Sequence, residues 1–119
     1  MDAVMLAEYG IDYEKALGSC MGNEAFLRKI LTMYLDDVSF GTAESAFKKR
    51  DCAALFLAVH ELKGVAGNAG FVGLYAAVLP LVELTRSGKC DWNKATELFE
   101  NLKKAYERTI AGILRSIPE

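Results

Sequence analysis

Residues 52–70 read CAALFLAVHELKGVAGNAG, and this stretch holds the only histidine in the chain, His60. Around a helix axis, at about 100° per residue, its apolar side chains gather on one face. The period predicts a helix that buries one side, begins after Asp51 and is closed by Gly70. The side chains of the predicted core face are Leu55, Ala58, Leu62, Val65, Ala66 and Ala69.

His60 points away from that core face. Its neighbours on the opposite side are Ala53, Phe56, Leu57, Lys63, Gly64 and Gly67. A glycine inside a helix costs about 0.5–1 kcal/mol relative to alanine, so two of them beside the histidine need a reason. Gly64, one turn after His60, would leave the imidazole open to a bulky partner. The alternatives are that the glycines let another helix of the same fold pack closely, or that they end the helix early.

Other helices are indicated by capping residues followed by apolar periodicity. Asp12 can cap a short helix that Gly18 or Gly22 ends, and Asp91 can cap a long final helix. Asn23 can cap another, with a bend or break expected near 39–42. Its predicted core stripe is Phe26, Leu27, Ile30, Leu31, Tyr34, Leu35 and Val38.

The predicted architecture is all-α. No segment alternates with a period of two, and a kinked helix is expected around Pro80. Four long helices joined by short connections bury their stripes most simply as an antiparallel four-helix bundle, here with short helices at the N-terminal end. With 119 residues, we expect a single domain over 1–119.

Composition narrows the classes of function. A net charge of -2 with mixed signs does not suggest nucleic-acid binding. The start of the chain lacks the basic segment of a signal peptide, and the apolar run 71–82 is too short to span a bilayer, so we expect a soluble, cytoplasmic protein that does not bind membranes. We also expect it to be a monomer. The basic run 48–50 is best explained as a helix end that complements the helix dipole, although it could also steer an acidic partner.

The cysteines give no sign of a disulfide framework or a zinc site. There are three, Cys20, Cys52 and Cys90, an odd number with no C-x-x-C spacing. We expect all three to be reduced packing residues.

The order His-x-x-Lys-Gly-x-x-Gly-x-x-Gly, which starts at His60 and ends at Gly70, resembles the signature of histidine-containing phosphotransfer (HPt) domains, the helical phosphocarriers of multistep two-component phosphorelays. The segments 10–17, 22–34 and 81–83 are also similar to flanking patterns in that family, so the resemblance covers nearly the whole chain. Three positions depart from the family. Asn23 stands where the family usually has an aspartate after the glycine. Val82 stands where many members have a glutamine that hydrogen-bonds the histidine ring, and Pro80 is unusual beside it.

The resemblance implies a function and a set of site residues. His60 would accept a phosphoryl group through Nε2 from an aspartyl phosphate and pass it to another aspartate, while Lys63 offsets the phosphoryl charge. Gly64 and Gly67 would give steric access. Phe56 and Leu57 would form the docking contacts.

The implied partners are a response-regulator receiver domain and a hybrid sensor histidine kinase. The chain would be a phosphocarrier and not an enzyme, with no cofactor or metal of its own, and Mg²⁺ would come from the receiver domain.

Other interpretations stay open from the sequence. Lys63 could be an ordinary solvated lysine, and Phe56 could be buried against the N-terminal turn. The whole chain could be a non-phosphorylated helical adaptor that binds a receiver or kinase domain through the same face. An enzyme with His60 as general base is disfavoured, because the sequence near it offers no paired acid, nucleophile or metal ligand.

Overall fold

The computed structural model describes residues 1–117 and contains only helices and connections in that range. The all-α prediction is therefore confirmed. The helices are α1 (Ala3–Glu8), α2 (Tyr13–Ser19), α3 (Glu24–Tyr34), α4 (Ser39–Lys48), α5 (Cys52–Ala69), α6 (Val72–Thr85) and α7 (Trp92–Ser116).

The predicted caps begin the helices where the sequence indicates. The side chains of Asp12, Asn23, Asp51 and Asp91 each accept a hydrogen bond from a backbone N–H in the first turn of the following helix. Gly70 ends α5 in the left-handed conformation, with φ 76°, as a helix-closing glycine commonly does. These predictions succeed because capping depends on residues close in sequence.

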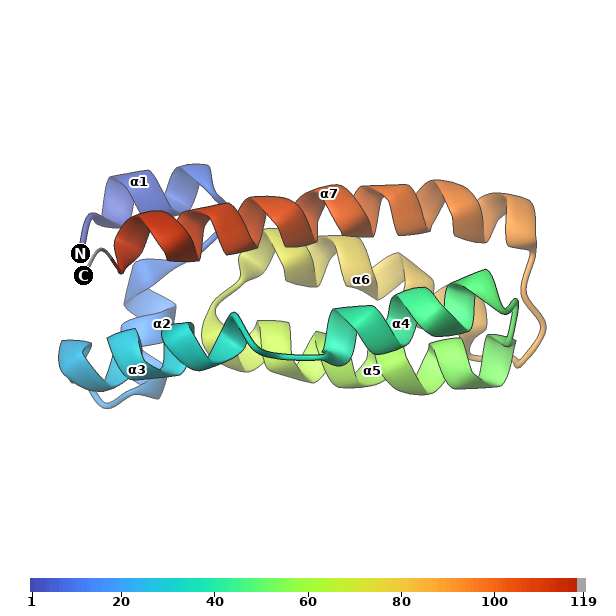
Figure 1. Ribbon diagram of the computed structural model, residues 1–119, viewed down its shortest axis with the longest axis horizontal. Helices are drawn as coiled ribbons and strands as arrows, with labels where there is room; N and C mark the ends of the chain where they lie inside the picture. The colour runs from blue at the N-terminus through green and yellow to red at the C-terminus, as the bar shows by residue number, and fades with distance from the viewer. Residues whose placement is uncertain (118–119) are drawn as a thin grey trace.

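The four helices α4 to α7 lie side by side along the molecule, each running back along the one before it (Figure 1). α5 packs between α4 and α6, and α7 covers the side of α6 away from α5. Aromatic stacking joins α4 to α7: the Phe47 and Phe99 rings lie 4.4 Å apart, and those of Phe40 and Tyr106 lie 4.2 Å apart. The largest fully buried side chains of the core include Leu31, Leu55, Leu81, Leu102 and Ile113.

The short helices α1 and α2 close one end of this assembly (Figure 1). α1 rests on α7 where Gly112 leaves room, since a Cβ at that position would lie 2.5 Å from the Cβ of Tyr9. The start of α2 is tied to the end of α5, because the Asp12 N–H donates to the Gly70 carbonyl at 2.8 Å. The end of the helix that carries His60 is thus fixed in place.

The prediction for the segment after Asn23 is wrong in two details. The helix breaks at 35–38, before the expected 39–42, because the Asp37 carboxylate accepts a hydrogen bond from the Ser39 N–H at 2.7 Å and so starts a new helix. Two members of the predicted core stripe are also exposed, Phe26 by 47% and Val38 by 74%. Val38 lies outside both helices, so the helical period does not apply to it.

The prediction of three reduced cysteines is also wrong. Cys52 and Cys90 form a disulfide, and only Cys20 is a free, buried packing residue. The two partners are 38 residues apart, and they meet because α6 returns along α5. Spacing along the chain carries no information about such a pairing.

α6 continues through Pro80, whose side chain is exposed. Proline has no N–H to donate to the carbonyl four residues before it in the helix, and the exposed position lets water bond that carbonyl instead. Among residues 1–117, no helix has both the length and the apolar character needed to cross a bilayer.

Candidate functional site

His60 lies on the exposed side of α5, opposite the buried face. The predicted core residues Leu55 and Leu62 are buried. Val65, at the edge of that face, is only half-buried, whereas Val59 is 0% exposed although the sequence did not assign it to the core. The helix therefore holds the imidazole in solvent, with a fully packed residue directly before it.

An open hollow of about 320 Å³ lies beside His60. Its lining residues come from α5 and α6: His60, Lys63, Gly64, Gly67, Asn68 and Tyr75. A Cβ added to Gly64 would meet nothing within 4 Å, so this glycine is not required for packing within the chain. A Cβ on Gly67 would lie 3.4 Å from Cε1 of Tyr75, an ordinary van der Waals distance, so the packing of α6 does not require a glycine there.

Phe56 and Leu57 flank the histidine on its N-terminal side. Leu57 is 69% exposed. Phe56 is half-buried, with its ring centroid 5.6 Å from that of His60 and 5.7 Å from Cζ of Arg86. Phe56 thus packs against the end of α6, and α1 lies at the other end of the molecule (Figure 1). The alternative of burial against the N-terminal turn is wrong.

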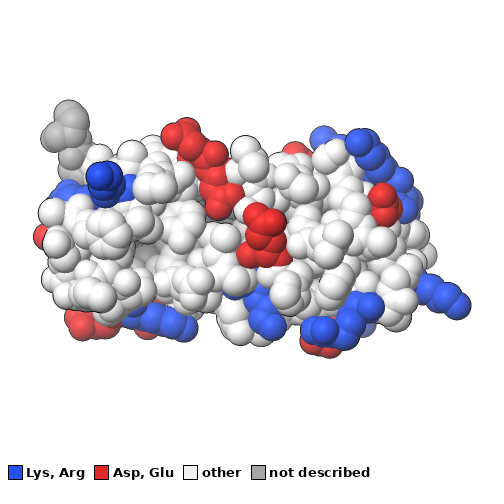
Figure 2. All heavy atoms as spheres, turned by 90° about the horizontal axis from the view of Figure 1, so that it is seen from below, with Lys and Arg blue, Asp and Glu red and all other residues white. Residues whose placement is uncertain are grey.

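Two cations border the site. Arg86 donates to Oε1 of Glu83 at 3.1 Å and to Oε2 at 3.4 Å, and these hydrogen bonds hold the pKa of Glu83 below its usual range. The charge of Lys63 also lowers the Glu83 pKa, by a smaller amount. In Figure 2, which views the molecule from below, basic side chains are most frequent along the lower edge and at the right end of the face, while acidic side chains lie near its middle and also at the lower left.

No side chain within residues 1–117 hydrogen-bonds the imidazole. Val82, at the family's glutamine position, is 0% exposed and belongs to the core. Glu83 is exposed and paired with Arg86. The nearest ring to His60 is instead Phe56, at an interplanar angle of 40°.

Sequence reasoning brought together the α5 residues of the site but missed Tyr75 on α6, Arg86 directly after α6 and Asn68 on α5. Asn68 lies inside the quoted motif, and its helical position beside Gly64 could have identified it. Tyr75 and Arg86 carry no local signal, because only the packing of α6 along α5 brings them to this face.

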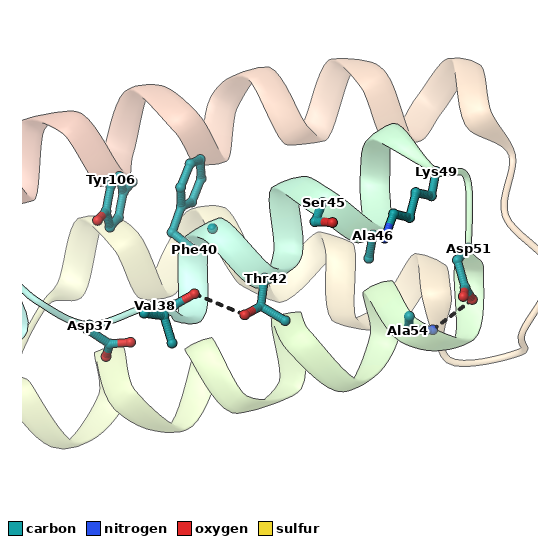
Figure 3. Close-up of a pocket in the computed structure, with 11 residues that line it drawn as sticks. Asp37, Val38, Phe40, Thr42, Ser45, Ala46, Lys49, Asp51, Ala54 and Tyr106 are labelled. Atoms are coloured by element: carbon teal, nitrogen blue, oxygen red, sulfur yellow. Dashed lines mark hydrogen bonds between the residues drawn. The ribbon is translucent and has the colours of Figure 1, made fainter.

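A larger hollow, of about 710 Å³, lies along α4 (Figure 3), and His60 is not among its lining residues. Two of its polar groups already serve helix geometry. The Thr42 hydroxyl donates to the Val38 carbonyl at 3.0 Å, and the Asp51 carboxylate accepts from the Ala54 N–H at 3.0 Å. It contains none of the site residues predicted from the sequence.

Comparison of the chain with models of protein families, with curated proteins and with solved structures found no match. The interpretation of the site therefore depends on its own residues and geometry.

Proposed function

We propose that the protein is a histidine phosphotransfer carrier of the HPt kind, which holds a phosphoryl group on His60 between receiver-domain aspartates. In this proposal α4 to α7 form the antiparallel four-helix bundle of that family, with α1 and α2 as its short N-terminal helices. The proposed partners are a response-regulator receiver domain and a hybrid sensor histidine kinase.

The observation that carries the proposal is the exposed imidazole beside an open hollow with a lysine at its edge. A phosphocarrier needs a nucleophile that another protein can reach, and imidazole is a suitable one near neutral pH. His60 is exposed, and the space beside it at Gly64 is empty. Lys63 lies one turn away on the same side of α5.

Phosphoryl transfer requires only a nucleophile and a nearby positive charge from the carrier. Nε2 of His60 attacks the phosphorus of an aspartyl phosphate, the P–O bond to the aspartate breaks, and the carboxylate leaves. Charge on the phosphoryl oxygens is offset by Lys63, and by Mg²⁺ held in the receiver's acidic pocket. The return transfer is the same step in reverse.

A non-phosphorylated adaptor is the second candidate, and a specific observation favours it. The ring of His60 has no hydrogen-bonding side chain among the described residues, and the residue at the family's glutamine position, Val82, has no polar side-chain atom and is buried in the core. Exposed Leu57 and half-buried Phe56 would serve protein docking with or without transfer.

Mixing the purified protein with labelled, phosphorylated receiver domains and Mg²⁺ tests the proposal. We expect acid-labile, base-stable label to move from the receiver to this chain. Binding without label across a receiver panel would contradict the carrier and support the adaptor.

Gly64→Gln is expected to slow transfer while keeping or raising stability. Glutamine favours a helix over glycine by roughly 0.5–1 kcal/mol, and nothing in the chain opposes its Cβ. Its side chain would fill the space beside His60. Urea unfolding and the transfer rate are the measurements.

Gly41→Gln is the matched control for Gly64→Gln, because Gly41 is also helical and open but lies on α4. It should give the same gain in stability and an unchanged transfer rate. Equal transfer rates for the two variants would show that Gly64 does not provide access.

Lys63→Ala is expected to slow transfer by about tenfold, since one partly exposed cation next to the phosphoryl group contributes about 1.4 kcal/mol at most. The measurement is single-turnover label transfer at low and high salt. Lys104→Ala, on the exposed side of α7, controls for the loss of a positive charge. If both variants slow transfer equally, Lys63 has no specific part in it.

A further inference from the structure

The disulfide lies in the seam between α5 and α6. Cys52 is the first residue of α5, and Cys90 lies in the connection between α6 and α7. Their Cα atoms are 5.8 Å apart, within the range that a disulfide spans without backbone movement. Both residues are half-buried, so the pair does not lie in the fully buried core.

The same seam reaches the His60 face. Cys52, Phe56 and His60 follow one another at four-residue steps, so they share one side of α5. On the other side of the seam, Arg86 comes four residues before Cys90 and places its guanidinium over the Phe56 ring. The disulfide and the imidazole are thus connected through the contact between Phe56 and Arg86.

Apart from the disulfide, the connection after α6 is attached to the last turn of α6, by the Arg86–Glu83 ion pair and by the Gly88 N–H, which donates to the Thr85 carbonyl at 3.0 Å. Residues 86–89 are all exposed and bury no apolar side chain. The start of α7 is held separately, by packing of Trp92 against Phe47 and by Arg50 over the Trp92 ring. A segment with so little burial opens locally at low cost once a covalent tie is removed.

We propose that the pair Cys52 and Cys90 is a reversible redox site that fixes the α6 edge of the His60 face. In the oxidised form the disulfide holds the connection at 86–90 and keeps Arg86 over Phe56. In the reduced form the connection moves, and the surroundings of His60 change. This proposal does not depend on phosphotransfer.

The oxidant would be a low-molecular-weight disulfide such as oxidised glutathione. One cysteine thiolate attacks it, forming a mixed disulfide and releasing one glutathione thiol. The second cysteine thiolate then attacks the mixed disulfide, forming the Cys52–Cys90 bond and releasing the second glutathione thiol. Two electrons pass from the protein to glutathione, and excess reduced glutathione reverses both exchanges.

The test equilibrates the full chain in buffers of oxidised and reduced glutathione and then alkylates free thiols under denaturing conditions. Of the three cysteines, we expect mass spectrometry to find one alkylated under oxidising conditions, Cys20, and all three under reducing conditions. Three alkylated thiols in oxidised glutathione would overturn the proposal. One alkylated thiol in excess reduced glutathione would also overturn it, since the bond would not be reversible.

The coupling to His60 has its own readout. Because the chain has one histidine, its imidazole gives a single Cε1–H signal by NMR. We expect this signal to shift on reduction and the amides of 86–90 to exchange roughly tenfold faster, while the centre of α7 is unchanged. Identical signals and exchange rates in both redox states would overturn the coupling.

Variants separate the pair from the third cysteine. Cys90→Ser should show the reduced spectrum in both buffers, whereas Cys20→Ala should respond to redox conditions as the unaltered chain does. A redox response that persists in Cys90→Ser would overturn the assignment. If a cysteine variant fails to fold, the comparison of the unaltered chain in the two buffers still tests the proposal.

Discussion

His60→Gln is expected to abolish label transfer from a phosphorylated receiver domain completely. The chain has no second histidine to accept the group, and an amide is not a nucleophile. Glutamine keeps a polar side chain of similar length at the same exposed position, so partner docking through Phe56 and Leu57 should persist. The measurement is acid-labile label on the chain at a fixed time, together with binding to the same receiver.

The fold should tolerate His60→Gln. The imidazole is exposed and forms no hydrogen bond with a described side chain, and glutamine is the better helix former. The free energy of unfolding should stay within about 0.5 kcal/mol of the unaltered chain. Lys104→Gln, an exposed change on α7, is the control for handling and label chemistry. Retained label on His60→Gln would show that another residue accepts the phosphoryl group.

Local signals in the sequence were sufficient for the starts of α2, α3, α5 and α7 and for one side of the site. Asp51 as a cap and Gly70 as a helix end are confirmed, since both depend on neighbours along the chain. The exposed position of His60 followed from the helical period of a long, regular stretch.

Features that depend on helix packing were not predictable in the same way. The Cys52–Cys90 bond, Tyr75 over Gly67 and Arg86 over Phe56 all require α6 to lie along α5 in one register. The period of a single helix says which face is buried but not which residue of another helix lies opposite it.

The break before α4 had a local signal that the apolar stripe obscured. Asp36 and Asp37 interrupt the apolar stripe. The Asp37 carboxylate accepts a hydrogen bond from the Ser39 N–H, and a local bond of this kind competes with continuation of the preceding helix. If the two aspartates are taken as a stronger signal than the apolar periodicity, the predicted core stripe ends before Val38.

Gly70→Ala is expected to destabilise the fold by about 3 kcal/mol, because two separate costs add. The residue has φ 76°, a conformation that disfavours any side chain. A Cβ there would also lie 2.9 Å from the backbone nitrogen of Ala16 and 2.9 Å from the carbonyl oxygen of Asp12. Neither contact can be relieved by rotating a side chain, so α2 must move away from the end of α5. Urea unfolding followed by circular dichroism measures the loss.

Two other glycines separate the costs of Gly70→Ala. Gly22 has φ 77° with nothing near its added Cβ, so Gly22→Ala should lose only about 1 kcal/mol, for the conformation alone. Gly64 is helical and open, so Gly64→Ala should gain about 0.5–1 kcal/mol. If Gly70→Ala costs no more than Gly22→Ala, the contact between α2 and α5 yields easily and does not hold the end of the His60 helix. A loss of stability that is largest for Gly70→Ala, smaller for Gly22→Ala and reversed for Gly64→Ala would give Gly70, the last glycine of the motif, a structural role. Gly64, beside His60, would then be available for contact with a partner.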